Sequence, residues 1–400
     1  MARRRLLPGA DARQGLVALA LNSSTSLVAG AMLGSLTDTF ERYPGLLVLV
    51  PAAIGLRGNV FGSLGNRVST SIHAGDLQLR LRRNTVLGQN VLAAGALTLG
   101  MSLILVLLAA LVSVGLGLGS TIGFADLSLV SVGGGALASI PVLAATLGLA
   151  AGAVRFGWDL DNVTAPLVST LGDVLTLPAL YLATGLLGLG LVTSTIGWAL
   201  AALAIAALVA GARSSLPQLR RIVRSSIPVL VMAGLVSSLA GVALERRLTT
   251  FSALPALLIL VPAHLSSSGA LGGILSGRLS SQLLLGLAPP TALPSRGARR
   301  DLWFVIGLSV PVFIVNGAGA DLVADVLGVA SPGLGDLVAA SLLGGLGAML
   351  VVLVIAYYGT IVTVRLGIDP DTYGIPMVSS TVDLVGALSL VVAIAVLGLS

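Results

Sequence analysis

Eleven long apolar segments separated by short loops dominate the chain and limit what it can fold into. They lie near residues 16–36, 45–72, 85–119, 128–154, 164–186, 190–211, 226–244, 254–285, 302–325, 336–363 and 374–399. About 20 apolar residues in a helix span the ~30 Å hydrocarbon core of a bilayer, and 56% of all residues are hydrophobic whereas 10% are charged. The pattern predicts an all-α polytopic membrane protein with eleven spans and excludes an ordinary soluble enzyme.

Two missing residue types exclude several chemistries. All 22 basic residues are arginine, and the chain has neither lysine nor cysteine. It therefore lacks the lysine of a phosphate-binding loop or a Schiff base, and the cysteine of a disulfide or a thiolate metal site. The two histidines, His73 and His264, are far apart without metal-ligand spacing, so an interfacial or structural role is expected. No enzymatic activity is predicted.

The arginines between the segments predict the orientation. With the N-terminus inside, three arginines fall outside (Arg42, Arg246 and Arg247) and sixteen fall on the cytoplasmic side: Arg3, Arg4, Arg5, Arg13, Arg80, Arg82, Arg83, Arg155, Arg213, Arg220, Arg221, Arg224, Arg296, Arg299, Arg300 and Arg365. Cytoplasmic loops carry the arginine excess, so we expect the N-terminus inside and the C-terminus outside the cell membrane. Clusters placed between apolar segments indicate a lipid bilayer as partner and argue against nucleic acid.

An internal repeat divides the chain. Residues 44–75 align without gaps with residues 255–286 at an offset of 211, where PGLLVLVPAAIGLRGNVFGSLGNRVSTSIHAG matches PALLILVPAHLSSSGALGGILSGRLSSQLLLG. At an offset of 210, RFGWDLDNVTAPLVSTLGD (155–173) matches RLGIDPDTYGIPMVSSTVD (365–383). The two halves of the chain are therefore homologous to each other.

The repeat predicts how the spans are organised. Each copy holds five spans, and the span near 190–211 has no counterpart. One extra crossing between two five-span copies makes them parallel, related by a pseudo-twofold axis along the membrane normal. We expect a cytoplasmic tail (1–15), a first repeat (16–186), a linker helix with a cytoplasmic loop (187–225) and a second repeat (226–400). Such a pseudo-dimer within one chain is expected to work as a monomer.

Two aspartates lie near the centres of equivalent segments, Asp173 in the first repeat and Asp383 in the second. A carboxylate at the centre of a membrane helix costs about 2.5–3.5 kcal/mol on insertion scales, so a functional role is expected. A serine four positions before each aspartate and a proline seven positions before it share the helical face of the aspartate. Each proline also leaves the backbone carbonyl four residues before it without a hydrogen-bond donor. The pore-lining candidates on these helices are Asn162, Pro166, Ser169, Thr170, Thr372, Pro376, Ser379 and Ser380.

The chemistry of these groups indicates the ligand. All of them offer oxygen, which hard divalent cations prefer, and magnesium keeps most of its water shell. If the carboxylates of Asp173 and Asp383 face each other across an axis, they would bind a hydrated divalent cation. That cation would be the transported substrate. The alternative is that each aspartate bonds a neighbouring serine or backbone group and locks helix packing.

The same residues resemble a known family, the membrane domain of MgtE magnesium transporters in the two-repeat form of solute carrier family 41. PAAIGLRGNVFGSLGNRVST is similar to the family's second-span signature, and the DPD...P...D block to its fifth-span signature. The resemblance implies passage of magnesium or a related divalent cation along the pseudo-twofold axis, with Asp173 and Asp383 as the central ion site. Arg57-Gly58-Asn59 becomes Ser268-Gly269-Ala270 in the second repeat, so an asparagine ligand, Asn59, comes from one half alone.

Four further acids precede the aspartate helices: Asp159, Asp161, Asp369 and Asp371. Helix capping explains one acid per helix, whereas each repeat has two. The alternative is a cytoplasmic vestibule where a bound divalent cation restrains flow, which suits a chain with few residues before its first span.

Other features leave alternatives open. The GxxxG pairs Gly58–Gly62 and Gly269–Gly273 are typical of close helix packing. Arg67 and Arg278 are either electrostatic gate residues or side chains that snorkel to the cytoplasmic interface. Two rival functions are a secondary transporter of another solute and an intramembrane aspartyl protease, in which paired carboxylates share a proton.

Overall fold

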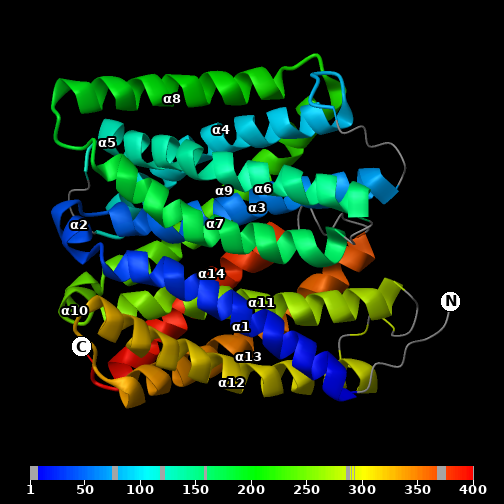
Figure 1. Cartoon of the computed structure of the whole chain (residues 1–400), viewed down its shortest axis with the longest axis vertical. Coiled ribbons are helices and arrows are strands. Elements are labelled where there is room, and N and C mark those ends of the chain that lie inside the picture. Colours follow the sequence, from blue (N-terminus) through cyan, green and yellow to red (C-terminus); the bar gives the residue numbers. More distant parts are fainter. Residues whose placement is uncertain are drawn as a thin grey trace. The chain divides into compact units, whose positions relative to one another are not determined.

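The computed structural model describes residues 8–73, 80–117, 122–156, 160–284, 289, 291, 293–366 and 375–399. The regular secondary structure in these ranges is helical throughout (Figure 1), which confirms the predicted all-α class. Nine helices within the described ranges are long and apolar enough to cross a membrane. The other two expected spans correspond to α1 (Pro8–Gly34), whose apolar part Leu19–Gly34 is shorter, and to α7 (Leu160–Thr184). The total of eleven spans and their orientation stay predictions.

The helices group into two compact units. Unit 1 consists of the described residues within 1–37, 249–370 and 382–400, and unit 2 of those within 38–248 and 371–381. Each unit thus gathers helices from distant parts of the chain. Because the units group helices by packing, the repeat boundaries expected from the sequence stay a prediction.

In unit 1, α1 packs against α11 (Ala256–Leu284) and α12 (Arg296–Leu327), and both of these helices pack against α13 (Leu334–Leu366). Short α10 (Leu248–Ala253) precedes α11 along the chain, and α14 (Ile375–Val396) contributes its residues from Val382 onward. Leu271, Leu275, Val305 and Phe313 are fully buried in the core between α11, α12 and α13.

In unit 2, α3 (Leu46–His73) is the central helix. It contacts α4 (Val86–Gly115), α6 (Gly135–Phe156), α7 and α9 (Pro217–Glu245). Short α2 (Thr37–Arg42) precedes α3, and a π-helix, η1 (Leu129–Gly134), joins α5 (Phe124–Ser128) to α6. Helix α8 (Leu191–Ala212) packs on α4 and α5 at the edge of the unit (Figure 1). Its exposed Leu191, Trp198 and Ile205 suit contact with lipid.

The first long helix of each half of the sequence, α1 or α9, packs on the second-span helix of the other half, α11 or α3. The two contacts are equivalent. A methyl group on Gly30 of α1 would overlap the carbonyl of Ile259 on α11, and one on Gly241 of α9 would overlap the carbonyl of Val48 on α3. Both residues of the second contact are 211 positions from their counterparts in the first. The offset found in the sequence is therefore also an offset between equivalent backbone contacts.

Candidate functional site

Helix α7 presents Asp173 where it meets α3 in unit 2. Gly172 marks the approach, since a methyl group built there would lie 3.4 Å from Cβ of Arg57 and 3.6 Å from the backbone nitrogen of Gly58. Asp173 is 8% exposed. One turn later the buried Thr176 donates its hydroxyl to the Gly172 carbonyl of the same helix.

Helix α14 carries Asp383 directly after its contact with α11, at the equivalent register in unit 1. Side-chain atoms of Val382 lie 4.0 Å from methyl positions built on Gly269 and Gly272. Val382 and Gly269 correspond to Gly172 and Gly58 at offsets of 210 and 211. Asp383 is half-buried. In both units, therefore, the acid directly follows the residue at which its helix meets the second-span helix.

Arg57 is a buried arginine beside the α7 contact. It is 1% exposed, and its guanidinium donates to the Ala53 carbonyl and, over 3.2 Å, to the Ser102 hydroxyl of α4. Its Nε has no hydrogen-bond partner among the described residues. Gly135, directly after η1, leaves room for the group, because a methyl group there would overlap Nη2. π-Helical turns frequently occur at functional sites, and this one lies against a buried charge.

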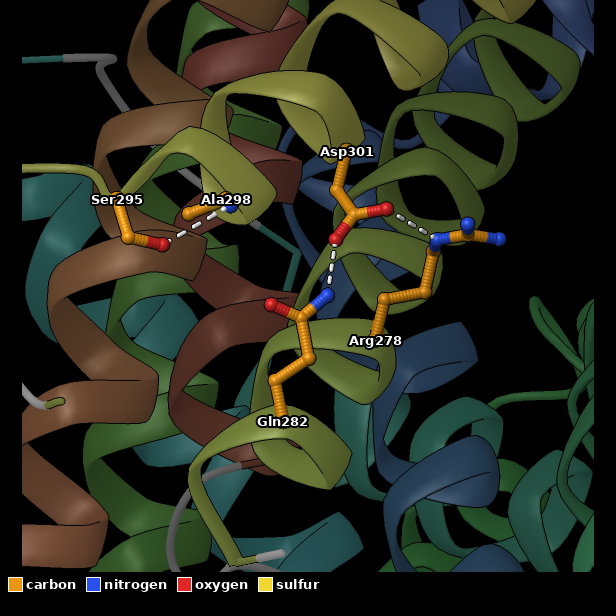
Figure 2. A network of polar contacts seen from close by, with 5 residues as sticks. All are labelled: Arg278, Gln282, Ser295, Ala298 and Asp301. Atoms are coloured by element: carbon orange, nitrogen blue, oxygen red, sulfur yellow. Dashed lines mark hydrogen bonds and ion pairs between the residues drawn. The ribbon is translucent and has the colours of Figure 1, made fainter. Parts of the chain in front are cut away.

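A polar network on the second-span helix of unit 1 was not foreseen (Figure 2). Arg278 on α11 donates through Nε to Asp301 on α12 at 2.8 Å, an ion pair, and Gln282 donates its amide to the other carboxylate oxygen. The arginine also lies 4.6 Å from the ring centroid of Phe304. The network fixes Arg278 to its neighbouring helix, which the sequence spacing of 23 residues does not reveal.

In unit 2, the equivalent arginine bonds to an uncharged amide. Arg67 on α3 donates through Nε to Oδ1 of Asn90 on α4, also at 2.8 Å. Both residues lie 211 positions before Arg278 and Asp301. An amide thus takes the place of the carboxylate in this unit.

The structure describes part of the predicted site. Asn59 and Ser380 are buried at 5% and 2% exposure, and Thr170 and Ser379 are half-buried. The side chains of Asp161, Asn162, Pro166, Ser169 and Pro376 lie outside the described part although their helices are included, and Asp159, Asp369, Asp371 and Thr372 lie wholly outside the described residues. The cytoplasmic vestibule therefore stays a prediction.

The glycine pairs differ from expectation. Methyl groups built on Gly62 and Gly273 meet no atom of the described residues within 4 Å, so the described part of the chain shows no close contact at these two positions. Close approaches to another helix occur at other glycines, among them Gly30, Gly197, Gly241 and Gly317. The chain contains 51 glycines, so glycine content alone does not show which of them lie at close helix contacts.

The described part of the site contains equivalent acids in the two repeats and no ready-made cage of metal ligands. Among the described residues, no group of three or more histidine, aspartate or glutamate side chains is placed to hold a metal ion. Asp173 and Asp383 each offer one carboxylate, and hydroxyl-bearing residues precede both on the same helix. That donor set suits a cation that keeps its water shell.

Comparison with known proteins matches the same helices. The family model MgtE, described as divalent cation transporter, matches residues 50–183 and 261–393. The chain is similar to solute carrier family 41 member 3 of Mus musculus, with 28% identity over 290 residues, covering 66% of this chain and 56% of that protein. It is also similar to solute carrier family 41 member 2 of Homo sapiens, with 25% identity over 294 residues, covering 70% of this chain and 50% of that protein. The chain spans about half the length of the curated relatives it matches. No solved structure matches it.

Proposed function

Because the chain belongs to the MgtE family of divalent cation transporters, we propose that it carries divalent cations, magnesium first among them, across the cytoplasmic membrane. Nine candidate spans in the described residues and membership of this family make it a multi-pass membrane protein. A membrane potential of about 100 mV, negative inside, supplies about 4.6 kcal/mol for a divalent cation, enough to drive uptake without another energy source.

The recurrence of an aspartate at the same register of both family-matched segments supports this proposal most directly. Asp173 lies in the segment 50–183 and Asp383 in the segment 261–393, each directly after the contact between its helix and the second-span helix. A packing role gives little reason to retain a costly acid at the same register in both halves. We propose that the two carboxylates serve one pore on the pseudo-twofold axis and bind magnesium through its water shell.

The proposed topology places the N-terminus inside and joins the two repeats in parallel through a linker span. Helix α9 supports this orientation, since its 29 residues span roughly 43 Å with Arg220, Arg221 and Arg224 near its start and Arg246 directly after its end. The chain has no cysteine, so Ser214→Cys and Arg247→Cys each introduce a single thiol. An impermeant reagent is expected to label them from opposite sides, and labelling of both from one side would contradict the orientation.

Feedback by internal magnesium is proposed to act through the acids before the two aspartate helices. Neutralising Asp161 and Asp371 together, with Asp159 and Asp369 intact as helix caps, should weaken inhibition by internal magnesium and spare flux itself. If flux depends on internal magnesium as in the wild type, helix capping would be the role that remains for these acids.

Ion flux into proteoliposomes tests the function directly. The wild-type chain should take up magnesium under an imposed inside-negative potential, and the double variant Asp173→Asn/Asp383→Asn should lose about tenfold or more of that flux. Asp325→Asn, which removes an exposed charge at the end of α12, is the matched control and should retain wild-type flux. Equal flux in all three proteins would refute the site.

A further inference from the structure

In unit 2, helix α8 covers one face of α4 (Figure 1). Gly100 of α4 lies close to α8, because a methyl group built on it would lie 2.7 Å from Cβ of Leu208. One turn later Leu103, which is 6% exposed, belongs to a buried cluster that includes Ala201 and Ala204 of α8. This face of α4 is therefore part of the protein core.

The equivalent face of α12 in unit 1 is exposed. Positions 100 and 103 correspond to Pro311 and Ile314 at the offset of 211, and Ile314 is 41% exposed. Val310 is exposed as well, and a methyl group built on Gly307 would meet no atom of the described residues within 4 Å. In the part of the chain that the structure describes, this face of α12 is thus left uncovered.

Two arginines and a tryptophan continue the same face towards the start of α12. Arg296, Arg300 and Trp303 come 11, 7 and 4 residues before Gly307, so all of them lie on one side of the helix. All three are exposed, Trp303 to 71%. We call this stripe the open face of α12; it consists of Arg296, Arg300, Trp303, Gly307, Val310 and Ile314.

The acids of α12 do not balance the charge of the open face. Asp301 follows Arg300 directly, but it is buried and accepts hydrogen bonds from Arg278 and Gln282 (Figure 2). The next acid on the helix, Asp321, lies about 31 Å from Arg300 along the helix axis. Two exposed guanidinium groups therefore remain for a ligand that carries negative charge.

The length of α12 places these arginines at the level of lipid headgroups. Its 32 residues extend about 48 Å, whereas the hydrocarbon core of a bilayer is about 30 Å thick. The apolar part begins at residue 302, and tryptophan is enriched at membrane interfaces. With Trp303 at the interface, Arg300 and Arg296 lie about 4.5 and 10 Å further out along the axis. The open face is therefore charged outside the core and apolar within it, as a phospholipid is.

We propose that the open face of α12 binds an anionic phospholipid. The lipid phosphate contacts Arg296 and Arg300, whose planar guanidinium groups suit phosphate oxygens. One acyl chain lies along Gly307 and Ile314, where α12 lacks the cover that α8 gives to α4. Charge complementarity selects the headgroup, because basic residues beside a membrane span attract anionic lipids. This site is separate from the proposed ion path and does not depend on the proposed function.

Fluorescence of Trp303 tests the site without relying on transport. The chain has three tryptophans, so Trp158→Phe/Trp198→Phe leaves Trp303 as the single reporter. The protein is placed in phosphatidylcholine vesicles that contain phosphatidylglycerol, and one of the two lipids is brominated in its acyl chains. Per mole of brominated lipid, phosphatidylglycerol should quench Trp303 at least about fivefold more than phosphatidylcholine. Because the bromine is on the acyl chain, the signal reports a bound lipid and not free phosphate.

Two charge-matched variants then locate the site. In the single-tryptophan protein, Arg296→Gln/Arg300→Gln should make the two brominated lipids quench equally. Arg82→Gln/Arg83→Gln removes the same charge from the exposed loop before α4 and should keep the preference for phosphatidylglycerol.

Three results would overturn the proposal. Equal quenching by both lipids before either arginine pair is changed would mean that the open face does not select anionic lipid. Loss of the preference in both arginine variants would assign it to general surface charge. Absence of quenching by either lipid would show that a second copy or another protein segment covers the open face.

Discussion

The contact between the second and third long helices of each half shows how one framework supports two chemistries. In unit 2, Arg67 meets the amide of Asn90, and in unit 1, Arg278 meets the carboxylate of Asp301, both at 2.8 Å. The helices meet at the same register, whereas the charge of the partner differs. Duplication has therefore preserved helix geometry more strictly than the polar groups that the geometry carries.

The local surroundings explain why each partner suits its own unit. Asn90 also donates its amide to the Val86 carbonyl of its own helix at 2.9 Å, which a carboxylate would repel. Asp301 accepts from Gln282, and Gln282 corresponds to Ser71 in the other unit. The difference between the units thus involves a set of residues and not a single substitution.

The largest loss of stability is expected where the two units are most alike. Gly30→Ala and Gly241→Ala each place a methyl group on a backbone carbonyl, and overpacking against backbone should cost about 3 kcal/mol. Gly62→Ala and Gly273→Ala meet open space and should gain up to about 1 kcal/mol from helix propensity. Reversible unfolding in mixed micelles measures all four, and clearly different losses for Gly30→Ala and Gly241→Ala would contradict the equivalence of the two contacts.

Exchanging the polar partners should be costly in unit 1. Asp301→Asn removes the charge that Arg278 pairs with and sets one amide against the amide of Gln282, so a loss of about 1.5–3 kcal/mol is expected. The same unfolding assay measures it, with exposed Asp325→Asn as the control. A variant as stable as wild type would mean that the ion pair contributes nothing to the fold.

The reverse exchange should cost less and should be rescued. Asn90→Asp gains an ion pair with Arg67 and loses the bond to Val86, for a net cost of about 1 kcal/mol. Adding Ser71→Gln supplies the donor that Gln282 provides in unit 1 and should recover most of that loss. If the double variant unfolds as readily as Asn90→Asp alone, the two networks are not interchangeable.

Sequence reasoning located the features with a strong local signal. The apolar segments, the repeat and the family signature follow from residue type and spacing, and the all-helical class agrees with them. The burial of Arg57 and His264 and the pairing of Arg278 with Asp301 depend on which helices become neighbours, and hydrophobic pattern does not encode that. For the same reason, the GxxxG spacing does not show which neighbours Gly62 and Gly273 meet.

The smallest effect is expected at the helix caps, where the units agree in kind. Thr85 accepts from the backbone nitrogen of Gly88 and Ser295 from that of Ala298, both at 3.2 Å (Figure 2 shows the second). Thr85→Ala and Ser295→Ala should each cost about 0.5 kcal/mol, the low end of the range for a capping side chain. A cost confined to one unit in the unfolding assay would show that the other cap is replaced by another donor–acceptor pair.

Magnesium flux in the two single aspartate variants compared with the double variant tests the central claim that both halves serve one path. If Asp173 and Asp383 share one ion, Asp173→Asn and Asp383→Asn should each lower flux about tenfold or more, and the double variant should lose little beyond either. Two independent pathways would instead leave about half of the flux in each single variant and abolish it in the double one. That second pattern would contradict the account.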